Sequence, residues 1–204
     1  KKGAIFLSTP FSRKAVDRLV KLKVKAFKIG SGECNNYPLV DYIASFGKPI
    51  IISTGMNDIN SIKKAIKILK KRKVQYAILH TTNLYPTNHN QVRLNALTEL
   101  KKMFPNTVIG LSDHTGDNYT SYAAIAMGAS IIEKHFIDNS SRKGPDISAS
   151  VNTKQMMELI KGVNLIHKAI PGGIKPISKE KKTANFAFAS VVANKDLEKG
   201  TILN

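Results

Sequence analysis

Two histidines stand at the ends of two apolar segments, and this placement points to metal chemistry. The first segment covers residues 107–114 and ends at His114, and the second covers residues 129–136 and contains His135. Both are rich in β-branched residues and have the length of buried strands. Between them, apolar residues recur at helical spacing over residues 117–127.

A strand, a helix and a strand in this order place the two strands parallel, with both carboxyl ends at one edge of the sheet. Side chains alternate along a strand, so Ser112 shares a face with His114, and Glu133 shares a face with His135. Neutral imidazoles bind divalent cations, and a nearby carboxylate adds charge or accepts the other ring hydrogen. The alternative is two buried structural histidines. Because ligands collect at this edge of parallel sheets, the pattern favours a functional site.

The rest of the chain repeats the alternation of strand and helix. Further strands are predicted at residues 4–8, 26–30, 49–54 and 76–80, and helices after Ser12 and at residues 38–46, 59–69, 94–103 and 153–169. These six units are typical of a parallel α/β protein. A closed barrel needs eight strands. Since the sequence is two units short and begins without Met, we interpret it as a fragment that lacks an N-terminal portion.

Beyond residue 170 the pattern changes. A Pro-Gly-Gly segment breaks the last helix, and a Lys-rich polar segment follows. Residues 186–193 resemble a strand, which is followed by a turn and the start of another strand at residues 201–203. We therefore expect a partial catalytic domain over residues 1–170, a linker over 171–185 and the truncated start of a second domain over 186–204.

Composition limits the class of protein. The chain has 204 residues, a formal net charge of +18 and one cysteine, Cys34. It has no apolar run long enough for a membrane span and no signal peptide, so we expect a soluble cytoplasmic protein in a reducing compartment. The lysines are spread over predicted helix faces, which is typical of a solvated surface. Attraction of an anionic small substrate is an alternative origin for part of the charge. A basic nucleic-acid-binding protein is the last alternative, and the scattered lysines argue against it.

Polar side chains also stand where the other predicted strands end. They are Ser8, Thr9, Lys28, Ser31, Ser53, Thr54, Thr82, Asn83 and Tyr85. Taken singly, the hydroxyls could cap the next helix and Lys28 could reach to solvent. Converging beside a metal site, they indicate a pocket for a phosphorylated carbon acid, with an electrophile held on a cation.

The remaining candidates are less specific. His89 lies in a polar loop and His167 late in a helix, so both are interpreted as surface residues. His80 has two interpretations, packing within the barrel or support of the site. Cys34 has no base placed beside it by the sequence, which favours a structural role.

Seven short segments together resemble the bacterial sialic acid synthase (N-acetylneuraminate synthase) family. They are residues 6–12, 28–38, 52–56, 80–86, 110–115 and 133–136 with 142–146, and the similarity extends to residues 186–190. The resemblance implies a (β/α)8 TIM barrel, of which this chain would hold about strands three to eight. It also implies a C-terminal antifreeze-like domain that crosses to the partner in a domain-swapped homodimer.

The reaction implied by the resemblance condenses phosphoenolpyruvate with N-acetylmannosamine and releases phosphate by C–O cleavage. Legionaminic and pseudaminic acid synthases resemble this family in the same machinery, so the acylated amino sugar stays open. A third hypothesis is a barrel that binds ligands but has lost catalysis. No nucleic-acid or membrane partner is expected.

The resemblance also implies roles for particular residues. His114 and His135 would be ligands of Mn²⁺ or Mg²⁺, Tyr85 and Asp146 would bind the sugar, and Glu133 would transfer a proton or support the metal. The phosphoenolpyruvate pocket would be formed by Thr9, Lys28, Ser31, Ser53, Asn83 and Ser112. Lys28, Tyr85 and Glu133 are the catalytic candidates. The family's glutamate and lysine near its first two strands are absent from this sequence, so the chain by itself is expected to be inactive.

Overall fold

The computed structural model describes residues 3–139 and 141–202, and its centre is a parallel sheet in which strand order follows chain order. The strands are β1 (Phe27–Ile29), β2 (Ile50–Ser53), β3 (Tyr76–Thr81), β4 (Val108–Asp113), β5 (Ile131–Phe136) and β6 (Ser150–Val151). Every neighbouring pair is parallel. Such a sheet, with a helix after almost every strand, is half of an α/β barrel, which confirms the predicted fold class.

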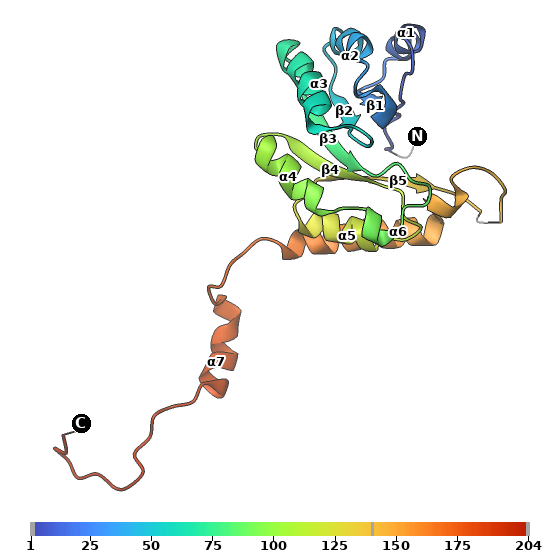
Figure 1. Cartoon of the computed structure of the whole chain (residues 1–204). Helices are drawn as coiled ribbons and strands as arrows, with labels where there is room; N and C mark the ends of the chain where they lie inside the picture. Colours follow the sequence, from blue (N-terminus) through green and yellow to red (C-terminus); the bar gives the residue numbers. More distant parts are fainter. Residues whose placement is uncertain (1–2, 140, 203–204) are drawn as a thin grey trace. The chain divides into compact units, whose positions relative to one another are not determined.

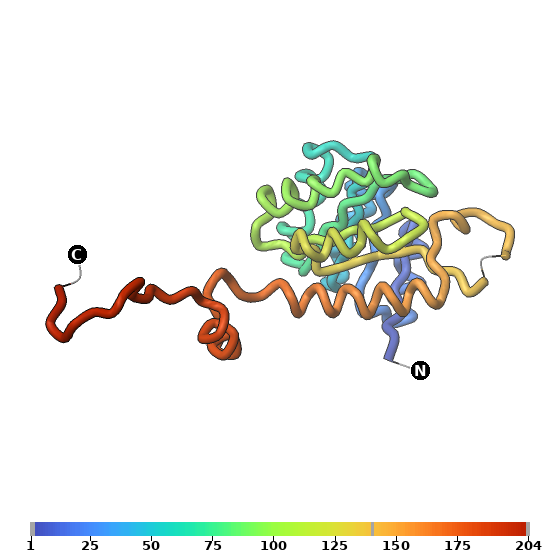
Figure 2. The backbone as a smooth tube through the Cα atoms, turned by 90° about the horizontal axis from the view of Figure 1, so that it is seen from below, coloured from blue at the N-terminus to red at the C-terminus, as the bar shows by residue number. Residues whose placement is uncertain are grey.

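Six helices cover the outer face of the sheet (Figure 1). They are α1 (Arg13–Lys21), α2 (Tyr37–Ala44), α3 (Ile59–Lys71), α4 (Asn95–Met103), α5 (Tyr119–Ala126) and α6 (Thr153–Ala169). The predicted cap is present, since Ser12 accepts a hydrogen bond from the Ala15 backbone at 3.2 Å. The predicted last helix is confirmed with the same bounds. Helices α5 and α6 lie side by side along β4 and β5 (Figure 2).

Strand alternation separates an apolar outer face from an inner face that becomes polar at the carboxyl edge. Phe27, Ile52, Ile78 and Leu111 point outward and are at most 1% exposed beneath the helices. On the inner face, the register aligns Thr81 of β3 with Ser112 of β4 and Glu133 of β5. The outer face therefore forms the core, and the inner face carries the polar row.

One predicted strand of the sheet is wrong and one strand of the sheet was not predicted, so the six strands expected there match the six in the described residues in number alone. Residues 4–8 are extended but form no ladder, and only Ser8 joins β1, accepting from the Lys28 backbone at 3.2 Å. Ile5 and Phe6 are 72% and 63% exposed, so no packing fixes this segment as a strand. The unpredicted β6 has two residues, which is too short to show a periodic pattern.

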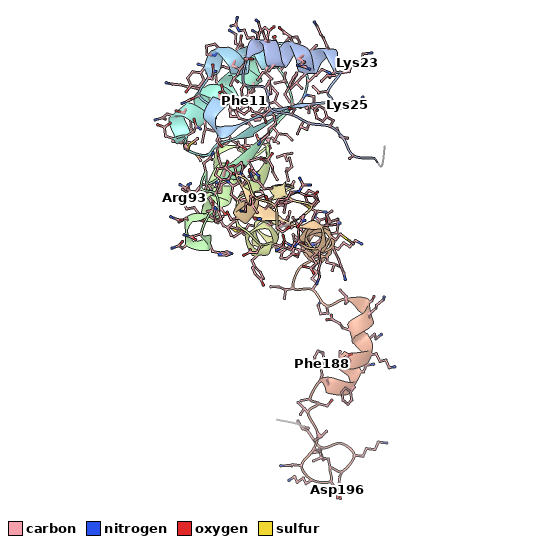
Figure 3. All side chains as sticks on the ribbon, turned by 90° about the vertical axis from the view of Figure 1, so that its right-hand side faces the viewer. Phe11, Lys23, Lys25, Arg93, Phe188 and Asp196 are labelled. Carbon is pink, nitrogen blue, oxygen red and sulfur yellow. The ribbon has the colours of Figure 1, made fainter. Side chains whose placement is uncertain are left out.

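Residues from Pro171 onward form a separate unit. The strand predicted at residues 186–193 is wrong, because helix α7 (Lys181–Ala187) reaches into it and the backbone after Ala187 is irregular. Phe188, labelled with Asp196 in Figure 3, is 78% exposed, and Val191 is fully exposed. A strand needs a partner and a buried face, and the described part of this unit supplies neither. Residues 201 and 202 of the second expected strand form no strand, and its residue 203 lies outside the described residues.

None of the helices in the described ranges is long and apolar enough to cross a bilayer.

Cys34 is fully buried beside α2, and burial raises the pKa of its thiol to about 11. At pH 8 only about one thiol in a thousand would be ionised, and the thiolate is the reactive form. We expect iodoacetamide to label the folded chain at least about a hundredfold more slowly than the urea-unfolded chain, as followed by mass spectrometry. Equal rates in the two states would contradict a buried structural thiol.

Candidate active site

The carboxyl ends of β1 to β5 surround a polar cavity of about 130 Å³. Its lining includes most of the predicted site residues: Lys28, Ser31, Ser53, Asn83, Tyr85, Ser112, His114, Glu133 and His135. Thr9 lines an adjoining cavity together with Lys28, Ser112, Glu133 and His135. The structure therefore brings together residues that lie more than 100 positions apart in the sequence.

A charged pair organises the centre of the cavity. The Lys28 ammonium donates to Glu133 Oε1 at 2.7 Å, and the Ser112 hydroxyl donates to the same oxygen at 2.7 Å. The Lys28 side chain is 9% exposed, whereas that of Glu133 is 40% exposed. These contacts hold the carboxylate in one orientation at the rim, with a cation beside it that an anionic ligand could share.

The two histidines face one another across neighbouring strands. Their ring centroids are 5.2 Å apart, with an interplanar angle of 67°. His114 donates from Nδ1 to the Thr82 carbonyl at 2.9 Å, and Nδ1 of His135 lies 4.0 Å from Asp146 Oδ2. In the described residues no hydrogen bond engages Nε2 of either ring.

This arrangement fits a divalent cation. A ring whose Nδ1 hydrogen is bound by a carbonyl presents the Nε2 lone pair to a metal, and such contacts orient histidine ligands in many metal sites. Burial, and next the nearby His135, lower the pKa of His114, which keeps its ring neutral as a ligand must be. Within residues 3–139 and 141–202 no group of three or more His, Cys, Asp or Glu side chains could hold a metal. Two imidazoles are thus what these residues offer, and water or substrate would complete the coordination.

Tyr85 covers this pair of rings. Its ring stacks on His114 at 4.2 Å and meets His135 edge-on at 5.5 Å. Burial raises the pKa of the phenol, and the charges of Asp146 and Glu133 raise it further. Tyr85 therefore remains a hydroxyl donor at neutral pH, beside the candidate metal site.

Buried polar atoms without partners also line the cavity. Ser53 Oγ, Thr81 Oγ1 and Asn83 Oδ1 have no hydrogen-bond partner in the described structure, and all three residues line the cavity. The one other such atom among the described residues is Asn118 Oδ1. Because an unpaired buried polar group is costly, three at one place indicate a bound polar ligand or ordered water.

Sequence reasoning missed Thr81 and left Thr82 without a role. The apolar run was taken to end at His80, yet Thr81 continues β3 and shares the inner face with Leu79. Alternation from Leu79 would have found it. Thr82 acts through its backbone carbonyl, which no side-chain pattern reveals.

The other histidines lie away from the cavity. His80 points to the outer face, where Nε2 is 2.7 Å from the Val92 carbonyl, which settles it as a packing residue. His89 is paired with Asp117 at the surface, and His167 is exposed. Asp146 occupies a left-handed turn with φ of 63°, and its carboxylate lies 4.0 Å from His135 at the edge of the site.

Gly55 has no room for a side chain at the edge of the cavity. An added Cβ would lie 1.8 Å from Asn83 Oδ1 and 2.9 Å from Ser31 Oγ. We expect Gly55→Ala to displace Asn83 and to destabilise the chain by about 1–3 kcal/mol, measured by urea unfolding. Gly32→Ala, where a Cβ meets nothing within 4 Å, is the control. Equal stability of the two variants would show that Asn83 is not held there.

A parallel half-barrel whose strand ends gather polar side chains on one edge defines the class of TIM-barrel-like α/β proteins. The NeuB family model matches residues 1–175, and the chain belongs to this family. It is 42% identical over 203 residues to N,N'-diacetyllegionaminic acid synthase of Campylobacter jejuni, covering 98% of this chain and 60% of that protein. It is 34% identical over 202 residues to human N-acetylneuraminate-9-phosphate synthase, covering 98% of the chain and 56% of that protein.

A solved structure shows the same fold. The N-acetylneuraminic acid (sialic acid) synthetase of Leptospira borgpetersenii, crystallised in complex with citrate, superposes with a TM-score of 0.85 and 30% identity. The similarity covers 91% of this chain and 65% of that one. The chain thus spans about three fifths of the length of these relatives.

Proposed function

We propose that this chain forms the greater part of a metal-dependent synthase that condenses phosphoenolpyruvate with an N-acylated amino sugar and releases phosphate. The observation that carries the proposal is the cavity itself. It places Lys28 and the unpartnered hydroxyls of Ser53 and Thr81 in the same cavity as the free Nε2 positions of the two histidines. That is a site for an anion beside a site for a cation.

The chain's own groups account for binding of the phosphoester. Lys28 would pair with the phosphate or carboxylate, and the hydroxyls of Ser31 and Ser53 would donate to its oxygens. Ser112, whose hydroxyl hydrogen is donated to Glu133, would line the pocket beside them. Asn83 would donate through its amide nitrogen. Thr9 would close the pocket from the adjoining cavity. These groups hold a doubly charged ligand at one end of the polar row.

The other residues would handle the sugar and the proton. A Mn²⁺ or Mg²⁺ ion held by His114 and His135 would polarise the aldehyde oxygen of the sugar. Tyr85 would orient the sugar with its hydroxyl, and Asp146 would contact it from the loop while orienting His135. Glu133 is held by Lys28 and Ser112 at the rim, where it can accept or return a proton.

The acceptor sugar is the finer question. The relative at 42% identity bears the name of a legionaminic acid synthase, and the superposed structure that of a sialic acid synthetase. We propose N-acetylmannosamine as the acceptor, with the diacetylated precursor of legionaminic acid as the alternative. We further propose that the whole protein is a homodimer in which an antifreeze-like domain completes the partner's site.

The test is an assay of the full-length protein with phosphoenolpyruvate and each of the two sugars. We expect phosphate release that depends on one sugar and stops when EDTA removes the metal. Phosphoenolpyruvate carrying ¹⁸O in the bridging position should yield labelled phosphate, since C–O cleavage leaves that oxygen on phosphorus. Absence of turnover with either sugar would refute the synthase. Sugar binding without turnover would favour a barrel that has lost catalysis.

A further inference from the structure

A buried ion pair lies on the outer face of the sheet, directly behind the two histidines. Lys134 Nζ is 2.9 Å from Asp113 Oδ2, and the two side chains are 1% and 0% exposed. Asp113 immediately precedes His114, and Lys134 immediately precedes His135. Because side chains alternate along a strand, the pair points away from the cavity while the histidines point toward it.

The pair is embedded in a closed set of hydrogen bonds. Asp113 Oδ2 also accepts from the hydroxyls of Thr120 and Ser121 at 2.7 and 2.6 Å, and Oδ1 accepts from the Thr115 backbone at 2.9 Å. Lys134 Nζ donates to the carbonyl and the hydroxyl of Thr115 at 2.7 and 3.0 Å. The set joins the ends of β4 and β5 to the first turn of α5, and both charges are well satisfied.

The ion pair lies where the hydrogen-bonded pairing of β4 and β5 ends. Asp113 and Lys134 are the last residues of β4 and β5 that are in register, and the pairing of these strands does not extend to His114 and His135. The strands are therefore free to diverge where the two imidazoles must come together. In the described residues, the ion pair and the two bonds from Lys134 to Thr115 link the strands at this point.

Stability alone is a weak explanation for such a pair. A buried ion pair often contributes no more to stability than apolar side chains of similar volume, because both charges lose their hydration. The neighbouring positions on this face, Leu111 and Ile132, are apolar. The best-documented role of a buried polar contact in an apolar layer is to fix one specific geometry.

We infer that the ion pair between Asp113 and Lys134 positions His114 and His135 and so sets the affinity and geometry of the cation site. Both are positioning residues, since their charged groups lie behind the sheet and act through the residues that follow them. The inference rests on the proposed function, because it requires that the two histidines bind a metal.

The test uses the full-length protein and two probe ions, Mn²⁺ for affinity and Co²⁺ for geometry. The double variant Asp113→Asn/Lys134→Met removes both charges and nearly keeps the volume. We expect it to fold, to bind Mn²⁺ about 10- to 100-fold more weakly by electron paramagnetic resonance, and to change the visible spectrum of bound Co²⁺. Thr115→Val, which removes one acceptor of Lys134, should shift the same spectrum by less and serves if the double variant does not fold.

Leu69→Ala, which truncates a buried core residue of α3, is the matched control for lost stability and should leave the Co²⁺ spectrum unchanged. If the folded double variant keeps both the Co²⁺ spectrum and the Mn²⁺ affinity of the wild-type protein, the inference is wrong, although the metal site is not refuted. If Thr115→Val alone folds, the same result for Thr115→Val overturns the inference. If the wild-type protein binds neither ion, both the proposed metal site and the inference are refuted. His114→Ala separates these cases, since it should bind neither ion whatever the role of the pair.

Discussion

Replacing His114 by alanine should abolish Mn²⁺ binding by the full-length protein and lower its turnover of phosphoenolpyruvate at least about a hundredfold. The reason is that the described residues offer two imidazoles at this site, so that loss of one leaves a single protein ligand among them. His114 is also the ring that the Thr82 carbonyl orients. Isothermal titration with Mn²⁺ and a phosphate-release assay measure the two effects.

His89→Ala is the matched control, because it removes an exposed histidine that is paired with Asp117 away from the cavity. It should leave both measurements within about twofold, which is the range of an ordinary surface substitution. If His114→Ala kept its Mn²⁺ affinity, the two rings would be structural. The synthase proposal would then lose its metal site.

Replacing Lys28 by methionine should weaken phosphoenolpyruvate binding about 10- to 100-fold. The ammonium is nearly buried, and a hydrogen bond to a charged group contributes about 1.5–3 kcal/mol. The substitution keeps the length of the side chain, and Glu133 retains its contact with Ser112. The effect should therefore appear as a raised KM for phosphoenolpyruvate, with the fold preserved by circular dichroism.

Lys63→Met on the exposed face of α3 makes the same change in net charge away from the cavity. It separates a specific contact from the general attraction of a chain with a net charge of +18 for an anion. An equal rise in KM for both variants would mean that Lys28 contributes only to the overall field. A smaller rise in KM for Lys28→Met at high salt would also indicate that Lys28 contributes only to the overall field.

Local patterns were sufficient for most of the helices and strands. The apolar periodicity and the Asn152 cap give α6 its bounds, and Ser12 begins α1 as predicted. They failed where a strand depends on a distant partner. Residues 4–8 have a strand-like composition but meet β1 through a single bond, and the segment after Ala187 has an apolar alternation with nothing to pack against.

The candidate site shows the same division. The alternation within β4 and β5 places Ser112, His114, Glu133 and His135 on one face, and the sequence predicts this from spacing alone. Thr81 was missed because the predicted strand ends at His80, one residue before the end of β3. The pair of Asp113 and Lys134 was also missed, since both residues lie on the outer face of the sheet, away from the cavity.

By itself the sequence determined that two histidines end neighbouring parallel strands and that hydroxyls, an amide and a lysine end the others. These features follow from periodicity over a few residues, which acts within each element. Only the tertiary structure decided which ring nitrogen is free, which buried oxygens lack a partner and which carboxylate holds Lys28. Those contacts join residues 32 to 105 positions apart. The sequence permits many other partners for these groups, and the packing of the half-barrel determines which of them come into contact.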